Sequence, residues 1–452
     1  MRNDTIASLS TALGESAIAI VRLSGPRSRE LADSVFRGKT SLAGTEARFV
    51  RYGRLVDERG EPFDEVLAFW FAAPRSYTGE EMAEIHCHGG NMAARLCLER
   101  LYGLGARPAR PGEFTQRAFL NGRIDLAQAE GVLATIQART ETALKAAQRG
   151  LTGVLSGETE KLREAILDLS AHIEASLDYP DEELPPLPAE ELLTRLDALR
   201  RQAGTLFERC RTGLLLRQGI SIALAGKPNV GKSSLLNALL ARPRALVTDV
   251  AGTTRDILEE PLAHRGVPLN LLDTAGLRDP LDEVEALGIG RTLEALQGAA
   301  LALFVVDGSR PLDGDDERVA SRLEGLPHLT VVNKSDLPSP VADEALFALS
   351  PTQGVLRLSA RTGDGIDSLK ETIVDAVVAS GLLDEGLNAS AFQLDELRRA
   401  LEGLDEARDA AVLGLDLAAS SLIEARLALE NVVGPSEESL LERIFNRFCV
   451  GK

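Results

Sequence analysis

The sequence has little of several features that define whole classes of protein. It contains no run close to the roughly 20 uninterrupted apolar residues that a membrane-spanning helix needs. The first residues, Met1-Arg2-Asn3-Asp4, hold no apolar core of the kind found in a signal peptide. An apolar fraction of 44% and a charged fraction of 26% are typical of globular domains. We therefore expect a cytoplasmic protein.

Cysteine is also scarce. The four cysteines, Cys87, Cys97, Cys210 and Cys449, follow neither a disulfide-framework spacing nor a zinc-site spacing. In a cytosolic chain we expect free thiols. The tripeptide His86-Cys87-His88 allows a metal-ligand interpretation, but no second cluster lies nearby in the sequence. Buried strand residues are therefore the favoured interpretation of this tripeptide.

Positive charge is the third shortage. The chain has 50 lysine and arginine residues against 68 aspartate and glutamate residues, which gives a formal net charge of −18. A dedicated nucleic-acid binder normally shows a basic field, so the balance argues against that class. The first 120 or so residues are close to neutral, and the acidic excess follows them. Contact with RNA would therefore need a local basic patch or a basic partner.

The length of 452 residues predicts two to four domains. Short strand-like runs and turns alternate at the start, which predicts an α+β domain. Residues favouring helices then dominate, and a later block alternates strand, loop and helix, as in a parallel α/β sheet. Helical segments return after that block. The expected domains are residues 1–120, 121–217, 218–378 and 379–452.

The two helical segments flank the α/β block. Each alone would expose its apolar stripe, whereas the two together bury it. The sequence therefore predicts a multidomain protein in which an α/β domain is inserted into an all-α domain, with a separate α+β domain before them.

A phosphate-binding motif opens the α/β block. Residues 226–233 fit the pattern G-x-x-x-x-G-K-[ST], between an apolar strand, Ile220–Ala225, and a helical run at 234–240. The glycines let backbone N–H groups surround the phosphates, Lys232 neutralises the β- and γ-phosphates, and the Ser233 hydroxyl can ligate Mg²⁺. The expected nucleotide contacts from this motif are Gly226, Asn229, Val230, Gly231, Lys232, Ser233 and Ser234.

Two further motifs supply groups for the γ-phosphate. Thr254, after Gly252-Thr253, can reach Mg²⁺ and this phosphate. Asp273-Thr274-Ala275-Gly276 follows an apolar strand at 269–272, where the carboxylate supports the Mg²⁺ shell and Gly276 allows close backbone approach. The expected contacts are Thr248, Asp249, Val250, Ala251, Gly252, Thr253, Thr254, Asp273, Thr274, Ala275 and Gly276.

The last two motifs select the base. Asn333-Lys334-Ser335-Asp336 ends a strand at 329–332, and Asp336 can accept two N–H bonds that guanine offers and adenine does not. Ser359-Ala360, after a strand at 355–358, closes the base pocket. The expected contacts are Asn333, Lys334, Asp336, Ser359, Ala360 and Arg361. Five motifs in this order, most of them at strand ends where open α/β sheets bind ligands, predict a GTP-hydrolysing protein.

One residue departs from Ras-like chemistry. Leu277 stands where Ras-type proteins carry the glutamine that orients the attacking water. An apolar side chain cannot do this, so another group must. Candidates lie in the acidic stretch from Asp279 to Glu285, although spacing alone favours a solvated charged loop for this stretch.

The sequence resembles the MnmE family, also called TrmE, of tRNA-modification GTPases along nearly its whole length. The matching segments are Asn3-Asp4-Thr5-Ile6, Ile20-Val21-Arg22-Leu23-Ser24-Gly25, Ser76-Tyr77-Thr78-Gly79-Glu80, His88-Gly89-Gly90, Pro111-Gly112-Glu113-Phe114-Thr115, Arg117-Ala118-Phe119-Leu120-Asn121-Gly122, Asp125-Leu126-Ala127-Gln128-Ala129-Glu130 and Phe448-Cys449-Val450-Gly451-Lys452. The resemblance implies an N-terminal domain like folate-binding domains, which also dimerises the protein, and a helical domain interrupted by the GTPase domain.

The resemblance further implies the activity and its partners. The family acts as a homodimer with the FAD-containing flavoprotein MnmG, in a heterotetramer or larger complex. Together they add a (carboxymethyl)aminomethyl-type group to C5 of the wobble uridine of certain tRNAs. The carbon comes from 5-formyl- or 5,10-methylene-tetrahydrofolate, and glycine or ammonium supplies the nitrogen. GTP, Mg²⁺ and K⁺ are the other implied cofactors.

Particular residues match the functional positions of the family. The implied K⁺ site is Asn229, Thr248, Val250 and Thr253, and the implied Mg²⁺ ligands are Ser233 and Thr254. The implied catalytic residues are Glu285, which reverses the interpretation of the acidic stretch from spacing, and Cys449 for the modification chemistry. The implied folate contacts are Arg22, Glu84, Arg123 and Lys452.

Two segments depart from the family pattern. Residues 11–16 replace a Thr-Pro-Pro-Gly-Arg-Gly-like run and carry a carboxylate in place of an arginine, and Arg123 stands where lysine is common. Both departures concern the folate site. Two other functions remain as alternatives, a regulatory or ribosome-assembly GTPase and a membrane-acting GTPase. The Phe-Cys-Val-Gly-Lys terminus argues against the first, and the lack of a basic amphipathic helix or lipidation signal argues against the second.

Overall fold

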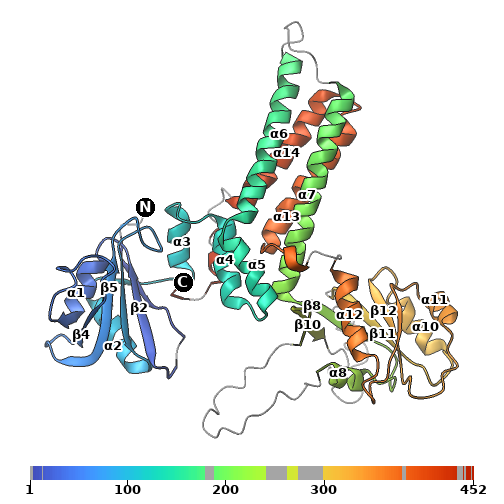
Figure 1. Cartoon of the computed structure of the whole chain (residues 1–452), viewed down its shortest axis with the longest axis horizontal. Helices are drawn as coiled ribbons and strands as arrows, with labels where there is room; N and C mark the ends of the chain where they lie inside the picture. The colour runs from blue at the N-terminus through green and yellow to red at the C-terminus, as the bar shows by residue number, and fades with distance from the viewer. Residues whose placement is uncertain are drawn as a thin grey trace, which may run out of the picture. The chain divides into compact units, whose positions relative to one another are not determined.

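The chain folds into two compact units, each of which is described by itself. The computed structural model describes residues 4–12, 14–178, 188–240, 262–272, 299–378, 383–434, 441, 444–448 and 450–451. The first unit comprises Met1–Leu133, Leu151–Arg200 and Glu396–Lys452. The second comprises Ala134–Gly150 and Arg201–Asp395 (Figure 1). The expected domain boundaries at 120, 217 and 378 remain predictions.

A seven-stranded sheet forms the N-terminal part of the first unit, in the order β3-β4-β5-β6-β2-β1-β7. Neighbouring strands are antiparallel except for β1 and β7, which are parallel. The strands are β1 (Ile6–Leu9), β2 (Ile18–Ser24), β3 (Phe36–Gly38), β4 (Arg51–Val56), β5 (Pro62–Phe71), β6 (Met82–His88) and β7 (Arg107–Pro108). Two helices, α1 (Ser28–Val35) and α2 (Asn91–Gly103), pack on one face of this sheet (Figure 1).

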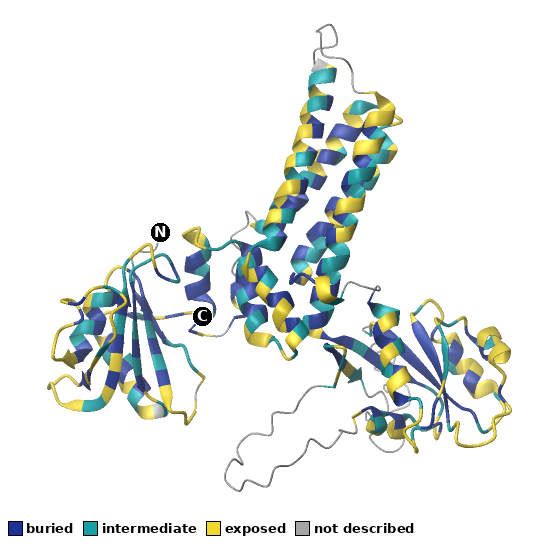
Figure 2. Cartoon of the chain, viewed as in Figure 1, coloured by how far each residue is buried: buried dark blue, intermediate teal, exposed yellow. Residues whose placement is uncertain are grey.

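Buried and partly exposed side chains alternate along the strands, which explains why helices cover only one face of the sheet. In β2, Ala19, Val21 and Leu23 join the core beneath α1 and α2, while the intervening Ile20 and Arg22 lie on the other face and are only partly buried. The same alternation produces the banded colouring of the strands in Figure 2. An antiparallel sheet that is packed on one face and more open on the other is the expected result.

The helix α3 (Glu113–Leu120) follows β7, and its buried charge is fully paired. The Arg117 side chain is only 7% exposed, and its guanidinium lies 2.7 Å from Asp4 Oδ1, 3.0 Å from Glu80 Oε2 and 3.3 Å from Glu113 Oε1. A buried arginine would be costly without such partners. The network therefore connects the beginning of the chain to α3.

The remaining helices of the first unit form a bundle. Its long members are α6 (Val154–Asp178), α7 (Ala189–Gln218), α13 (Ala391–Ala410) and α14 (Leu415–Val433), with α6 and α14 packed along each other (Figure 1). Helices α7 and α13 contribute residues to both units. Between α7 and α13, Arg408 Nε donates to Asp197 Oδ1 at 2.7 Å. Segments on either side of the α/β block thus meet in one bundle, as the apolar stripes predicted.

The helical run from 124 to 177 is interrupted in the structure. It is divided into α4 (Leu126–Gln137), α5 (Glu141–Leu151) and α6. Gly153, with φ of +75°, turns the chain between α5 and α6, and the Thr140 hydroxyl accepts the Ala143 N–H at the beginning of α5. The composition favoured helix throughout but did not indicate these two breaks.

The second unit is built on a six-stranded sheet in the order β13-β12-β11-β8-β10-β9. All neighbours are parallel except β9 and β10. The strands are β8 (Ile220–Ala225), β9 (Ala263–His264), β10 (Val267–Leu272), β11 (Leu301–Asp307), β12 (His328–Asn333) and β13 (Val355–Arg357). The described helices are α8 (Lys232–Leu240), α10 (Gly314–Ser321), α11 (Asp343–Leu349), α12 (Ile366–Val377) and the 3₁₀ turn η1 (Leu383–Glu385).

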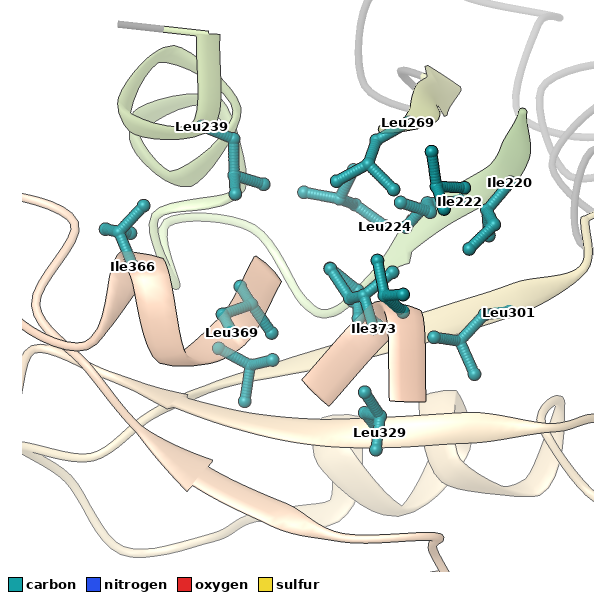
Figure 3. Close-up of a cluster of buried hydrophobic side chains, with 14 of the residues drawn as sticks. Ile220, Ile222, Leu224, Leu239, Leu269, Leu301, Leu329, Ile366, Leu369 and Ile373 are labelled. Atoms are coloured by element: carbon teal, nitrogen blue, oxygen red, sulfur yellow. The ribbon is translucent and has the colours of Figure 1, made fainter. Parts of the chain in front are cut away.

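Both faces of this second sheet are buried. Ile220, Ile222 and Leu224 of β8 pack with α8 and α12 (Figure 3). Ala223 and Ala225 face the opposite core, which includes residues of α10 and α11. Helices on both faces are characteristic of parallel sheets. The predicted fold class is confirmed: an α+β domain, an all-α bundle and an α/β nucleotide-binding-type domain. Within the described ranges, every helix is too short or too polar to span a bilayer.

A paired substitution on α2 tests the packing of the first unit. Leu101 is fully buried in the same core as Trp70, the only tryptophan in the chain, whereas Leu96 is 37% exposed. Leu101→Ala leaves a cavity and should lower the free energy of unfolding by about 2–5 kcal/mol, whereas Leu96→Ala should cost much less. Urea unfolding followed by Trp70 fluorescence measures the difference. Equal losses for the two variants would contradict this description of the core.

Candidate functional site

The loop between β8 and α8 has the backbone that the phosphate-binding motif requires. Asn229 and Gly231 both have positive φ, +66° and +98°. A Cβ at Gly226 would lie 2.4 Å from the Val305 carbonyl oxygen, and one at Gly231 would lie 2.3 Å from Asn333 Nδ2. These two positions therefore accept only glycine without rearrangement. The close approach of the loop to β11 and β12 depends on this.

The lysine and serines of this motif begin α8. Lys232 Nζ donates to the carbonyl oxygens of Gly226 at 2.7 Å and Lys227 at 2.9 Å, so its ammonium group is held by the loop itself. Ser233 and Ser234 follow in the first turn and are exposed. A lysine charge at the N-terminal end of a helix makes a site suited to an anion such as a phosphate chain.

The Asn333 side chain, at the end of β12, connects two loops. Its side chain is 2% exposed; Nδ2 donates to the Val230 carbonyl at 2.9 Å and Oδ1 accepts the Ala360 N–H at 3.0 Å. The phosphate loop and the loop after β13 are therefore fixed to the same side chain. This brings the predicted phosphate-binding and base-binding motifs together.

Lys334 reinforces this junction. Its Nζ lies 2.6 Å from Asp307 Oδ2, at the end of β11, and 3.2 Å from the Asn229 carbonyl oxygen. Burial alone would raise the pKa of Asp307, but the bonds from Lys334 and Ser309 hold it below its ordinary value. Asp307 belongs to none of the motifs that predicted the site. The one sequence feature that could have indicated Asp307 is its position at the end of an apolar strand, β11.

Asp336 faces the loop after β13. Its Oδ1 accepts the Ser359 hydroxyl at 2.6 Å, and its Oδ2 pairs with Arg361 at 2.7 Å. The bond from Ser359, followed by the charge of Arg361, holds the pKa of Asp336 below its ordinary value, so the group is a carboxylate at neutral pH. Arg361 is a donor with several N–H groups, and its contact shows that the Asp336 carboxylate can accept N–H bonds in this position. The paired N–H groups on the edge of guanine could be accepted by the same carboxylate.

A second lysine of the phosphate loop was missed by the sequence analysis. Lys227 Nζ lies 2.7 Å from Asp313 Oδ2 and 2.8 Å from Asp316 Oδ2, at the N-terminal cap of α10. Asp313 and Asp316 also form a capping box there. This ion pair fixes the first half of the phosphate loop to α10, and no spacing rule in the sequence predicted it.

Several predicted site residues lie outside the described residues. They are Thr248, Asp249, Val250, Ala251, Gly252, Thr253, Thr254, Asp273, Thr274, Ala275, Gly276, Glu285, Cys449 and Lys452. Their roles remain predictions. The described part of the candidate nucleotide site comprises the phosphate loop, the Asn333 junction (Asn333 with Val230 and Ala360) and the Asp336 cluster (Asp336 with Ser359 and Arg361).

A separate pocket of about 380 Å³ lies in the first unit. It is lined by side chains that include Arg48, Phe71, Arg75, Tyr77, Glu84 and Arg123. This set contains two of the four predicted folate contacts.

Glu84 and Arg22 form a pair at this pocket. Arg22 Nη2 lies 2.8 Å from Glu84 Oε1, and the two side chains are 17% and 13% exposed. Burial would raise the pKa of Glu84, but the bond from His86 and the charge of Arg22 outweigh it and lower this pKa. The carboxylate is therefore ionised at neutral pH. An ionised carboxylate can accept the paired N–H groups of an aminopyrimidinone ring.

The C-terminal segment returns to this part of the first unit. The Gly451 carbonyl accepts the Ser10 hydroxyl at 3.0 Å and Arg22 Nη1 at 3.4 Å. Upstream, a Cβ at Gly112 would lie 2.4 Å from the Phe445 carbonyl oxygen, so the chain packs closely there. Arg22 therefore contacts both Glu84 and the C-terminal motif that the family resemblance singled out.

The tripeptide considered as a metal site lies in β6. Cys87 is 2% exposed, and burial raises the pKa of its thiol to about 11. His86 Nε2 lies 3.3 Å from Glu84 Oε2, and His88 Nδ1 lies 2.6 Å from Asp64 Oδ1. No cluster of three potential metal ligands occurs in the ranges that the structure describes. Cys97 and Cys210 are also buried free thiols.

Comparison with known families covers almost the entire chain. Residues 5–123 match the family model described as GTP-binding protein TrmE N-terminus, and residues 126–449 match the MnmE helical domain. Among solved structures, the G domain of the T. maritima FeoB iron transporter is 26% identical and covers 35% of this chain and 98% of its own. Its TM-score is 0.26, too low to argue from.

Several relatives match this chain over nearly its whole length. A tRNA modification GTPase MnmE from Geobacter sulfurreducens is 42% identical, with 99% of both chains covered. Proteins of the same name from Carboxydothermus hydrogenoformans and Bacillus mycoides are 41% and 40% identical, with 100% of both chains covered. Together with the two family models, these matches extend across both units. The chain therefore belongs to the MnmE family, also named TrmE, of tRNA modification GTPases.

Proposed function

We propose that this chain hydrolyses GTP in a K⁺-dependent manner and couples that hydrolysis to the modification of the wobble uridine of tRNA. The chain is a GTPase of the tRNA modification class, by its family. The observation that carries the nucleotide part of the proposal is the Asn333 junction, which fixes the phosphate loop and the loop after β13, next to the Asp336 cluster, to one side chain. A GTP molecule would place its phosphates at the phosphate loop and the N–H edge of its guanine at Asp336.

Ion binding follows from the exposed end of the phosphate loop. Ser233 presents its hydroxyl in the first turn of α8, which suits a Mg²⁺ ligand beside the phosphates, with Thr254 as its proposed partner. The Asn229 side chain is exposed on the same loop, and we assign it to a K⁺ site with Thr248, Val250 and Thr253. Because Leu277 cannot orient water, Glu285 is the proposed positioning base, and K⁺ would supply positive charge to the transition state.

The folate proposal rests on the pocket of the first unit. Glu84 and Arg123 line it, and Arg22 connects Glu84 to the C-terminal segment. An ionised, partly buried carboxylate beside aromatic side chains suits the N–H-rich ring of a tetrahydrofolate. Cys449 lies two positions before Gly451 in the sequence, so we propose that the one-carbon chemistry takes place near it, with Lys452 as a further folate contact.

Homodimerisation is proposed through the open face of the first sheet. Tyr52 of β4 is paired with Leu67 of β5, and Leu67 is paired with His86 of β6, so the three side chains share one face. Tyr52 is 63% exposed and Leu67 is 43% exposed. On neighbouring segments, Phe49 is 57% exposed and Ile18 is 53% exposed. Clustered apolar exposure of this kind marks an interaction surface. The flavoprotein MnmG is the second proposed partner and tRNA the third. Because the chain has a formal net charge of −18, contact with tRNA needs a local basic patch or a basic partner.

The first prediction concerns the choice of base. Asp336→Asn replaces one acceptor oxygen by a donor, so GTP binding should weaken by roughly 10- to 100-fold while xanthosine triphosphate binding improves. Isothermal titration with both nucleotides measures this. Asp315→Asn, an exposed carboxylate on α10, is the matched control and should change neither affinity. Unchanged GTP affinity in Asp336→Asn would refute the assignment of the base pocket.

The second prediction concerns K⁺. GTP hydrolysis should be fast in K⁺ and slow in Na⁺ at equal ionic strength, because the smaller ion fits a K⁺-sized cage poorly. Asn229→Gly tolerates the same positive φ and removes only the amide, so it should bind GTP and lose the K⁺ stimulation. Steady-state phosphate release in the two salts provides the measurement. Similar rates in K⁺ and Na⁺ for the unmodified chain would remove the K⁺ site from the mechanism.

The third prediction separates hydrolysis from tRNA modification. Glu285→Ala should bind GTP almost normally and lose hydrolysis by roughly 10²–10⁴-fold, as expected for a general base, while the nearby Glu283→Ala should not. Cys449→Ser should keep GTP hydrolysis and lose modification, because a hydroxyl is a far weaker nucleophile than a thiolate. GTP turnover and mass analysis of wobble nucleosides are measured on both variants.

Two results would contradict this separation. Normal GTP turnover in Glu285→Ala would show that Glu285 has no catalytic role and belongs to a solvated acidic loop. Wild-type modification by Cys449→Ser would show that the cysteine is only a small structural residue. Loss of modification with intact nucleotide binding is the pattern that distinguishes this chain from a regulatory or ribosome-assembly GTPase.

A further inference from the structure

The pocket of the first unit has a charge opposite to that of the chain. Three arginines, Arg48, Arg75 and Arg123, line it together with one carboxylate, Glu84. The chain as a whole carries a formal charge of −18. A net positive lining within an acidic protein raises the local concentration of anions. The ligand of this pocket should therefore be anionic.

Two of these arginines, Arg48 and Arg123, donate hydrogen bonds to the carbonyl groups of consecutive residues. Arg48 Nη2 donates to the Arg75 carbonyl oxygen at 2.7 Å, and Arg123 Nε donates to the Ser76 carbonyl oxygen at 3.2 Å. A guanidinium has five N–H donors, and each of these bonds uses one of them. The two side chains are thus oriented by the loop at 72–81 while retaining donors for a ligand.

The backbone at Arg48 supports a functional role. Its φ is +70°, a conformation that is uncommon for residues other than glycine, and its N–H donates to the Trp70 carbonyl at 2.7 Å. Such conformations persist where the surrounding structure imposes them, and they gather at ligand sites. Both Arg48 and Arg75 are exposed although they line the pocket, so they lie at its rim.

The lining therefore combines two kinds of recognition. Glu84 is largely buried and suits the N–H groups of a ring, and the aromatic side chains of Phe71 and Tyr77 suit its faces. The rim arginines suit carboxylates, which a guanidinium binds through paired N–H bonds. A ligand with an N–H-rich ring at one end and several carboxylates at the other satisfies both.

We propose that Arg48 and Arg75 bind the carboxylates of a poly-γ-glutamyl tail, so that this chain prefers tetrahydrofolates carrying several glutamates over the monoglutamate. The inference rests on the proposed use of a tetrahydrofolate and adds the form of that ligand. Each additional γ-glutamyl unit contributes one more carboxylate for the rim. The ring end of the ligand is unaffected by the length of this tail.

Titration of the full chain with two probes tests the proposal. The probes are 5-formyl-tetrahydrofolate with one glutamate and with three. The triglutamate should bind about tenfold more tightly at low salt, as two partly exposed ion pairs allow, and the advantage should shrink at high salt. Arg75→Ala should abolish this advantage by weakening triglutamate binding to about the affinity of the monoglutamate. Arg59→Ala, an exposed arginine on the β4–β5 turn, is the matched control and should retain it.

A second variant guards against a folding artefact. Arg48→Gly removes the guanidinium and suits the positive φ, so it should reproduce the effect of Arg75→Ala with unchanged unfolding by Trp70 fluorescence. Equal affinity of the unmodified chain for both folates would overturn the inference and leave folate binding intact. Failure to bind either folate would instead overturn the proposed use of folate. Weaker tRNA binding in Arg75→Ala with an unchanged folate ratio would assign the rim to RNA phosphate, against this proposal.

Discussion

The nucleotide-binding unit depends on one buried amide. Asn333 ends a central parallel strand and bonds at once to the phosphate loop, through Val230, and to the loop after β13, through Ala360. Because the carboxyl ends of parallel strands meet at one edge of a sheet, a single side chain can span loops far apart in sequence. Gly231 must be a glycine because a Cβ there would overlap the same amide. Lys334 and Lys227 then anchor this arrangement to β11 and α10.

The two candidate sites of the chain each combine a carboxylate with cationic side chains, in different arrangements. The candidate nucleotide site places the Lys232 ammonium group at the phosphate loop and a carboxylate, Asp336, beside Ser359. The pocket of the first unit uses a carboxylate, Glu84, deep in its lining and arginines at its rim. In both, hydrogen-bonding neighbours lower the pKa of a carboxylate, so that an ionised group is available to accept bonds from an N–H-rich ring.

Much of the fold and part of each site could be predicted from the sequence. The strand Ile220–Ala225 has the predicted bounds because a short apolar run lies between clear turn signals. The composition after residue 124 favoured long helices but did not locate the breaks between them, because the break between α5 and α6 depends on the conformation of a single glycine, Gly153. Motif order identified Asn333 and Asp336. It could not reveal Lys227 with Asp316, separated by 89 residues, because such pairs obey no local spacing and arise only from packing.

The contact between Ser10 and the Gly451 carbonyl has a consequence for biosynthesis. The two residues are 441 positions apart. At a translation rate of about 5–20 residues per second, the second emerges roughly 20–90 seconds after the first. The nucleotide-binding unit is complete earlier, because its last residues precede α14. A chain that ended before α14 would therefore contain all residues of the nucleotide-binding unit but would lack the Gly451 carbonyl that bonds to Ser10 and Arg22.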